Sequence, residues 1–483
     1  MAVPFSRTSP AHAWRIARIA GGVVAIGIVC GATAAYTQPV YAVLALLAMV
    51  TGAYVASKRR LTLLAFIGVC TLLPYGVIPA SIGGVRLTLI DVLLTLLLAS
   101  CVLRLISRQG FAFVTSPIDG LVLLFIGLMI MSFIIGTAYS APPEKTRQFF
   151  KLINSILFFF TTNQLIRTRR DLMFLIRSLI VGGALAALAG IVLYHLPAAT
   201  SSQFLRSLRP LGYPVGEVLR YVEDNGVRTT TLRAIGTSVD PNVFGAVLLM
   251  TGSLAIGALL AATGRIRIVL VLAVGLIAYA LLLSLSRGSW IGLAMAVGVL
   301  AIVRYRYLLW AIPFMALPIV AVFYRSFARY VEHFLKAIYA QDQATGMRLG
   351  EYKDALTLIQ QNPWFGVGFG AAPSGDLYLG VSSTYLLVAE EMGLIGFAVY
   401  LLLVISVIAI GIQNYQSSPD DSRRVTLPIL ASFVGMVTSA TFDQHFFNLR
   451  YQHMAALYFM MAALVILSSR VYSADNKTEY EQD

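Results

Sequence analysis

The chain has 483 residues, of which 58% are hydrophobic and only 12% are charged, and its mean hydropathy is +0.80. This composition excludes an ordinary water-soluble globular protein and indicates a polytopic membrane protein. The net charge of +14 does not indicate nucleic-acid binding, because Lys and Arg occur in short clusters between apolar runs, as membrane topology requires.

The N-terminal apolar run from Ile19 to Tyr36 lacks a clear cleavage site and is followed at once by a second run. We therefore interpret it as a retained helix and not as a signal peptide. All three cysteines lie inside apolar runs without a CxxC pair, so neither a disulfide framework nor a zinc site is indicated: Cys30, Cys70 and Cys101.

Apolar runs long enough to cross a membrane, which takes roughly 20 helical residues, recur along the whole chain. They predict an all-α fold, a single transmembrane domain over residues 1–483 with about fourteen membrane helices. The runs centre on residues 18–37, 40–56, 62–79, 87–105, 118–138, 149–165, 172–195, 243–262, 268–285, 289–303, 307–323, 383–411, 426–442 and 454–469.

Basic residues in the short connections set the orientation of these helices. Under strict alternation, six basic clusters fall on one side, which we take as cytoplasmic: Lys58-Arg59-Arg60, Arg104 with Arg108, Arg167 with Arg169 and Arg170, Arg265 with Arg267, Arg304 with Arg306, and Arg423-Arg424. Both termini are then cytoplasmic, and the polar residues 473–483 are expected to form a disordered tail.

Two sizeable segments, residues 196–242 and 324–382, face the outside in this topology, the second with short helices. Long loops cross membranes largely regardless of charge, so a solvated surface accounts for most of their basic residues. These are Arg206, Arg209, Arg220, Arg228 and Arg233 in the first segment, and Arg325, Arg329, Lys336, Arg348 and Lys353 in the second.

The sequence Ser286-Arg287-Gly288-Ser289-Trp290 lies between two apolar runs with almost no loop. An arginine at the centre of a membrane helix costs about 2.5–3.5 kcal/mol on insertion scales, and less at the interface, so it usually serves a partner. The alternative is an arginine that reaches lipid phosphates, with Trp290 as an interface anchor. We favour a functional arginine, because the helix before it carries no other charge on this side.

Residues 346–396 begin as a charged amphipathic helix, break at Asn362-Pro363 and continue into a glycine-rich turn before a second apolar helix. The turn contains Gly366, Gly368 and Gly370, and the second helix carries Glu390 and Glu391. This arrangement places the turn at the end of a membrane helix, where we expect the catalytic site.

Four of these elements, in this order, resemble the O-antigen ligase and Wzy-type polymerase superfamily. They are GTSVDPNVFGAVLL (236–249), SRGSW (286–290), NPWFGVGFG (362–370) and STYLLVAEEMGLIGF (383–397), so the resemblance covers about residues 230–400. The later sequence DQHFFNLRYQHMAAL (443–457) resembles a C-terminal element of some polymerase-like members.

The resemblance implies a membrane glycosyltransferase of the GT-C type in the bacterial cytoplasmic (inner) membrane. Such enzymes take a glycan from undecaprenyl diphosphate at the outer face and transfer it to an acceptor hydroxyl with inversion, without a metal, nucleotide sugar or other cofactor. In agreement, the outer segments contain no DxD motif and no cluster with metal-ligand spacing.

A diphosphate leaving group still needs its charge neutralised, which arginines do with bidentate hydrogen bonds in a low-dielectric site. We expect Arg287 first and Arg348 second in this catalytic role, with Arg233 binding the substrate. Arg233 lies just before Asp240-Pro241-Asn242, whose helix-cap chemistry would hold it near the membrane.

The chain departs from the family pattern at the base that activates the acceptor. Family ligases carry His-Asn or a similar pair where this chain has Ser382-Ser383, so either another group acts as base or the activated leaving group makes a strong base unnecessary. Glu391 matches the acidic position of the family and is predicted to be catalytic, although a carboxylate paired for structure is an equal alternative. Further candidates for contact with the substrate are Gly366, Gly368, Gly370, Ser382, Ser383, Glu390, His445 and His453, the two histidines as alternative bases.

The leading hypothesis is a polymerase that joins undecaprenyl-diphosphate-linked repeat units into exopolysaccharide, capsule or O antigen. The missing histidine favours this over the first alternative, a ligase that attaches finished polymer to lipid A core. The second alternative, a lipid-linked oligosaccharide transporter, fits less well because the charges gather at the outer helix ends and not at the midplane. Expected partners are the lipid-linked glycan, membrane lipids, a chain-length regulator and a flippase.

Overall fold

The structure is a computed structural model that describes residues 58–82, 85–106, 113–137, 143–214, 216–224, 227–310, 343–370, 381–448 and 450–480. The chain divides into two compact units, Met1–Thr62 and Leu63–Asp483, and almost all of the described residues lie in the second. The predicted runs at 18–37 and 40–56, most of the run at 307–323, and Arg325, Arg329 and Lys336 lie outside the described residues.

Most described residues are helical, as predicted. The long helices are α3 (Arg59–Leu72), α4 (Leu89–Ile106), α5 (Asp119–Thr137), α6 (Pro143–Leu165), α7 (Arg169–His195), α9 (Pro241–Ala261), α10 (Gly264–Ser284), α11 (Arg287–Val303), α15 (Thr384–Ser417), α16 (Asp420–Ser439) and α17 (Gln452–Tyr480). Among the described residues, six helices are long and apolar enough to cross a membrane: α5, α7, α9, α10, α15 and the first 21 residues of α17. The chain is therefore a multi-pass membrane protein, while the total of fourteen spans stays a prediction.

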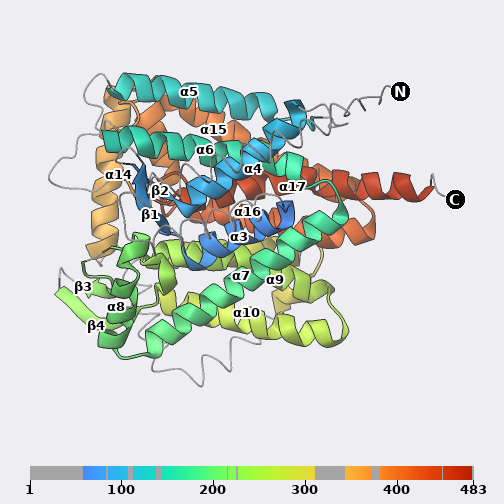
Figure 1. Ribbon diagram of the computed structural model, residues 1–483, viewed down its shortest axis with the longest axis horizontal. Coiled ribbons are helices and arrows are strands. Elements are labelled where there is room, and N and C mark those ends of the chain that lie inside the picture. The colour runs from blue at the N-terminus through green and yellow to red at the C-terminus, as the bar shows by residue number, and fades with distance from the viewer. Residues whose placement is uncertain are drawn as a thin grey trace, which may run out of the picture. The chain divides into compact units, whose positions relative to one another are not determined.

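The smaller elements gather at one end of these helices, which we call the site end (Figure 1). They are α8 (Ala198–Ser207), the short 3-10 helices η1 (Arg209–Leu211) and η2 (Gly236–Ser238), α14 (Gln343–Gln361), and two antiparallel hairpins, β1 (Val77–Ile82) with β2 (Val85–Thr88) and β3 (Arg220–Asp224) with β4 (Val227–Arg233).

Two short hairpins are the departure of the described residues from the predicted all-α fold. The apolar run at 62–79 is helical only to Leu72, because Pro74 cannot continue the helix, and the β-branched residues Val77 and Ile78 open a strand instead. In the second hairpin Arg220 pairs with Arg233 and Asp224 with Val227.

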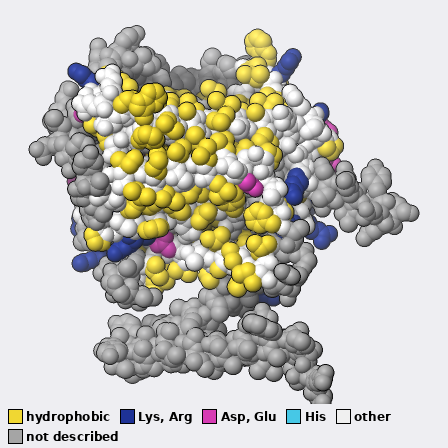
Figure 2. Space-filling view, turned by 90° about the horizontal axis from the view of Figure 1, so that it is seen from above, with side chains coloured by type: hydrophobic (Ala, Val, Ile, Leu, Met, Phe, Trp, Pro, Cys, Tyr) yellow, Lys and Arg dark blue, Asp and Glu magenta, His cyan; other side chains and the backbone are white. Residues whose placement is uncertain are grey.

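Four of the predicted basic clusters lie at the helix ends away from the site end, since α7, α10 and α16 begin there and α11 ends there. They are Arg167 with Arg169 and Arg170, Arg265 with Arg267, Arg304 with Arg306, and Arg423-Arg424. Figure 2 shows an apolar surface between Lys and Arg side chains at its two edges. Arg304, directly after α11, also pairs with Asp420 of α16 at 2.8 Å, which joins the two helices at this end.

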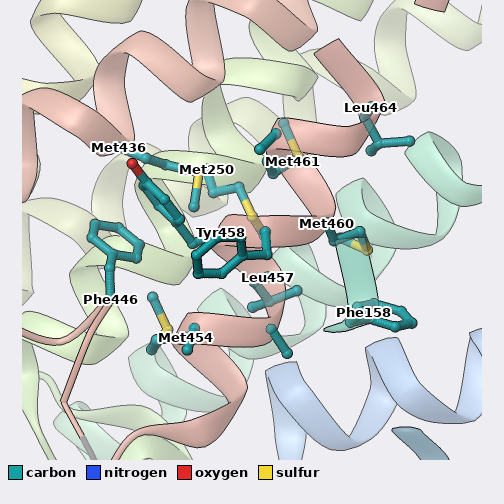
Figure 3. Packing of buried hydrophobic residues seen from close by; sticks show 14 of the residues in the cluster. Phe158, Met250, Met436, Phe446, Met454, Leu457, Tyr458, Met460, Met461 and Leu464 are labelled. Atoms are coloured by element: carbon teal, nitrogen blue, oxygen red, sulfur yellow. The ribbon is translucent and has the colours of Figure 1, made fainter. Parts of the chain in front are cut away.

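The core is built around α17, which packs against α6, α15 and α16 and is buried over most of its apolar length. Its methionines and Tyr458 face Phe158, Met250 and Met436 of three other helices (Figure 3). Near the start of α17, Gln452 donates to Asp91 of α4 at 2.7 Å, and Asp91 pairs with Lys151 of α6 at 2.9 Å. These polar residues therefore tie three helices together.

At its other end α17 continues to Tyr480, within the segment that was expected to be disordered. Residues 473–480 contain neither glycine nor proline, so no residue there stops a helix that has already formed.

Candidate active site

Arg287 stands at the first position of α11, after a sharp reversal of the chain. The helix before it ends at Ser284, and Leu285 takes the left-handed conformation with φ 53°, which a non-glycine residue rarely adopts. Trp290 is half-buried and donates from Nε1 to the carbonyl of Leu281 at 2.8 Å. Trp290 thus fastens the reversal, which argues against the alternative in which it anchors to lipid.

Arg233, at the end of β4, binds the same reversal from the other side. Its Nε donates to the carbonyl of Ser284 at 3.0 Å, and its Nη2 donates to the carbonyl of Leu285 at 3.3 Å and to Asn242 Oδ1 at 2.9 Å. A cation at this place satisfies carbonyls that the end of α10 leaves unpaired.

The three predicted arginines converge. Burial lowers the pKa of Arg233 to about 10, the nearby Asp240 opposes this shift, and the charges of Arg348 and Arg287 lower the pKa further. Arg348 and Arg287 therefore both lie within electrostatic reach of Arg233. The Asp240 and Asp443 carboxylates offset part of this positive charge, and a bound anion would offset more of it.

We expect Arg233→Ala to lower the free energy of unfolding, because hydrogen bonds to a charged group contribute about 1.5–3 kcal/mol each and the Ser284 and Leu285 carbonyls would lose theirs. Thermal unfolding of the purified protein in detergent measures this. Arg206→Ala, at an exposed position of α8, is the matched control and should unfold like the unmodified protein. Equal melting temperatures for both variants would contradict the capping role.

Arg348 is carried on α14, which lies against the start of α15. Glu351 Oε2 accepts the backbone N–H of Ser382 at 2.9 Å, and the Tyr352 hydroxyl donates to the Ser382 carbonyl at 3.1 Å. Ser383 is buried and precedes the first residue of α15. The backbone of Ser382 thus holds α14, and with it Arg348, in position, while Ser383 is the N-cap residue of α15.

The Asp240 carboxylate accompanies the arginines. It caps α9, its Oδ1 accepting the N–H groups of Asn242 at 2.8 Å and Val243 at 3.0 Å. Val239 before it has φ 57°, which is strained for a β-branched residue. Both described non-glycine residues with positive φ, Val239 and Leu285, are therefore next to the arginine cluster. Strain of this kind gathers at functional sites.

The glycine-rich turn proves to be part of the framework of α15. The helix is broken at Gly393, with φ 68° and ψ −174°. The N–H groups of Val367 and Gly368 donate to the carbonyls of Glu390 and Glu391 at 2.9 and 3.1 Å, and the N–H of Leu394 donates to the Pro363 carbonyl at 2.7 Å. The turn therefore satisfies the backbone on both sides of the break, which an apolar environment requires.

This packing leaves no space for a side chain at two of the predicted substrate-binding glycines. A Cβ on Gly366 would lie 2.4 Å from the Glu390 carbonyl oxygen, and one on Gly368 would lie 2.4 Å from the Gly136 nitrogen of α5. Gly370 differs, because a Cβ there would only touch the Lys145 side chain. Gly366 and Gly368 thus serve close backbone packing, and their contact with the substrate stays a prediction.

Glu391 belongs to the turn as well. Its Oε1 accepts the N–H of Gly370 at 3.2 Å, while its buried Oε2 has no hydrogen-bond partner among the described residues. The Lys145 ammonium, which donates to the Gly370 carbonyl, is near this carboxylate. Glu390 is also buried, with Asp354 of α14 nearby. If Glu391 is instead a carboxylate held for structure, its partners are the Gly370 N–H and the Lys145 ammonium, and not an arginine.

The loop between α16 and α17 carries His445, and α17 begins beside it with His453. Asp443 was not predicted, although it stands two residues before His445 in the sequence DQH. Its Oδ1 lies 3.1 Å from His445 Nδ1, and its backbone carbonyl accepts both the N–H and the hydroxyl of Thr384. The loop is thus fixed to the start of α15, beside Ser383.

Part of the chain matches a known protein family. Residues 272–401 match the Wzy_C family model, described as O-antigen ligase, which confirms the resemblance to the O-antigen ligase and Wzy-type superfamily. The match contains Arg287, Arg348 and Glu391. No curated protein matches the chain. One solved structure, described as "Structural coordination of polymerization and crosslinking by a peptidoglycan synthase complex", is similar with 17% identity and a TM-score of 0.39, over 73% of this chain and 98% of that chain.

Proposed function

Since residues 272–401 match the O-antigen ligase family, we propose that this protein is a membrane glycosyltransferase that polymerises lipid-linked repeat units of a surface polysaccharide. The donor is a glycan on undecaprenyl diphosphate, and the acceptor is a hydroxyl of a second glycan. The reaction takes place at the site end, which faces the outside of the bacterial cytoplasmic membrane, and both termini face the cytoplasm. The basic clusters at the opposite helix ends support this orientation.

The convergence of Arg233, Arg287 and Arg348 is the observation that carries the proposal. A diphosphate ester presents at least two negative charges, which these guanidinium groups can neutralise. Arg287 is at the first position of α11, where the helix dipole disfavours a cation and favours an anion. A bound diphosphate would remove both the dipole penalty and the mutual repulsion of the arginines.

In this mechanism the acceptor oxygen attacks the anomeric carbon while the bond from that carbon to the diphosphate oxygen breaks. The leaving diphosphate gains negative charge, which Arg287 and Arg348 stabilise through charge-assisted hydrogen bonds in a partly buried site. Attack from the face opposite the leaving group inverts the configuration. In this scheme the arginines neutralise the charge of the leaving diphosphate.

The ligase that transfers polymer to lipid A core is the second candidate, because the family match covers both activities. Ser382 and Ser383 favour the polymerase, since neither side chain is a strong base at the position where family ligases carry a histidine, and the backbone of Ser382 instead holds α14. A chain-length regulator and a flippase are the partners that a polymerase needs.

Deleting the gene and separating the surface glycan and the lipid-linked glycan by gel electrophoresis tests the proposal. We expect loss of all long polymer, restored by the intact gene, with single repeat units accumulating on lipid. Long polymer that accumulates on undecaprenyl diphosphate without attachment would instead identify the ligase. Repeat units trapped on the inner leaflet would identify a transporter and overturn both candidates.

A further inference from the structure

The Asp443 and His445 side chains form a fixed pair at the site end. The Asp443 backbone is held by Thr384, and its Oδ1 accepts the N–H of Gln444 at 2.7 Å while lying 3.1 Å from His445 Nδ1. The His445 side chain is only 1% exposed. A histidine held in this way has one ring nitrogen facing a carboxylate and the other directed away from it.

That other nitrogen, His445 Nε2, is buried without a hydrogen-bond partner in the part of the chain that the structure describes, and Nδ1 approaches Asp443 Oδ1 at ion-pair distance without a hydrogen bond. A buried polar atom without a partner costs about 1–3 kcal/mol, so native proteins rarely keep one that has no use. A hydroxyl group of a bound acceptor would supply the missing hydrogen bond.

The pair also lies beside the arginine cluster. Burial raises the pKa of the Asp443 carboxyl, but His445 and Arg348 lower it more, so its pKa is below the ordinary value. Arg233 is within electrostatic reach of the same carboxylate. Asp443 is therefore ionised at neutral pH, and an ionised carboxylate keeps the proton of a neutral imidazole on Nδ1. This leaves Nε2 able to accept a proton.

We propose that His445 is the general base that activates the acceptor hydroxyl, with Asp443 as the positioning residue that sets its tautomer; this rests on the proposed function. The hydroxyl proton moves to His445 Nε2 as the acceptor oxygen forms its bond to the anomeric carbon. The electron pair of the breaking bond stays on the diphosphate oxygen, which the arginines hold. His445 then returns the proton to water.

His453 is the competing base, since its Nε2 is also buried without a hydrogen-bond partner among the described residues. It interacts electrostatically with His445, but in the described part of the chain no carboxylate lies within ion-pair distance to fix its tautomer. Tyr352 and Tyr451 are also within electrostatic reach of Asp443. His445 is therefore the base that the geometry selects.

The test compares His445→Gln with His195→Gln, an exposed histidine at the end of α7 that bonds Tyr279. Polymer formation is measured in membrane vesicles that contain the native lipid-linked repeat units, and donor binding is measured separately with undecaprenyl diphosphate in nanodiscs. We expect His445→Gln to lose about 10²–10⁴-fold in rate, as for removal of a general base, and to keep donor binding. His195→Gln should keep both.

The pH profile separates a base from a structural residue. The rate of the unmodified protein should fall at acidic pH, and this acidic limb should vanish in His445→Gln. Asp443→Asn should lower the rate and change the same acidic limb. Asp443→Glu should recover part of the rate. These two variants test the role of the pair if His445→Gln fails to insert into the membrane.

Three results would overturn the proposal: transfer by His445→Gln at the normal rate, an unchanged acidic limb in the Asp443 variants, or equal loss of donor binding and transfer. If instead the unmodified protein neither binds undecaprenyl diphosphate nor forms polymer, the proposed function itself has failed.

Discussion

Replacing Arg287 with alanine is expected to abolish polymer formation while the protein still inserts into the membrane. The loss of one donor to a charge that develops in the transition state typically lowers the rate about 10²–10³-fold. Arg287 also occupies the start of α11, beside Arg233. Arg348→Ala should have a similar effect, because the leaving diphosphate is held from both sides.

The matched variants make this prediction specific. Arg287→Lys keeps the charge but loses the bidentate geometry, so it should recover only part of the rate. Arg206→Ala removes an exposed arginine at the same end of the molecule and should form polymer normally. Polymer is measured on gels of surface glycan, with membrane content measured by immunoblotting. Near-normal polymer from both Arg287→Ala and Arg348→Ala would remove the leaving-group role.

The second large effect concerns stability. Gly393→Ala should destabilise the protein by at least about 3 kcal/mol, because φ 68° with ψ −174° is open almost only to glycine. The added Cβ would also lie 2.3 Å from the Trp364 carbonyl oxygen. The glycine-rich turn and the broken helix would then have to separate, and their backbone groups would lose partners in an apolar environment.

Gly275→Ala on α10 is the matched control, since a Cβ there meets no atom within 4 Å. Alanine is favoured over glycine inside a helix by about 1 kcal/mol, so this variant should be as stable as the unmodified protein or slightly more stable. Melting temperatures in detergent compare the two. Equal melting temperatures for Gly393→Ala and Gly275→Ala would show that the helix break at Gly393 is not essential for stability.

The sequence was sufficient to predict the helix reversal at Arg287 and the three arginines that converge there. An arginine between two apolar runs has few positions available to it. Asp240-Pro241 marks the start of a helix, and this start fixes the position of Arg233 in the fold. The helical membrane class also followed directly from apolar run lengths, because a membrane demands continuous apolar helices.

The role of the glycine-rich turn could not be predicted in the same way. Its glycines have the composition of a ligand-binding loop, but their partners are carbonyls of α15, and the break at Gly393 is invisible in an apolar run that reads as one helix. The hairpins were missed because β-branched residues after Pro74 are as apolar as the helix before it. Asp443 was missed because its function depends on Thr384 and His445, which only the folded chain brings to it.

The most direct test is a structure determined by cryo-electron microscopy in nanodiscs that contain undecaprenyl diphosphate. The diphosphate should lie within hydrogen-bond distance of the Arg287 and Arg348 guanidinium groups. A diphosphate bound at the opposite helix ends, beside Arg265 and Arg304, would contradict the proposed site.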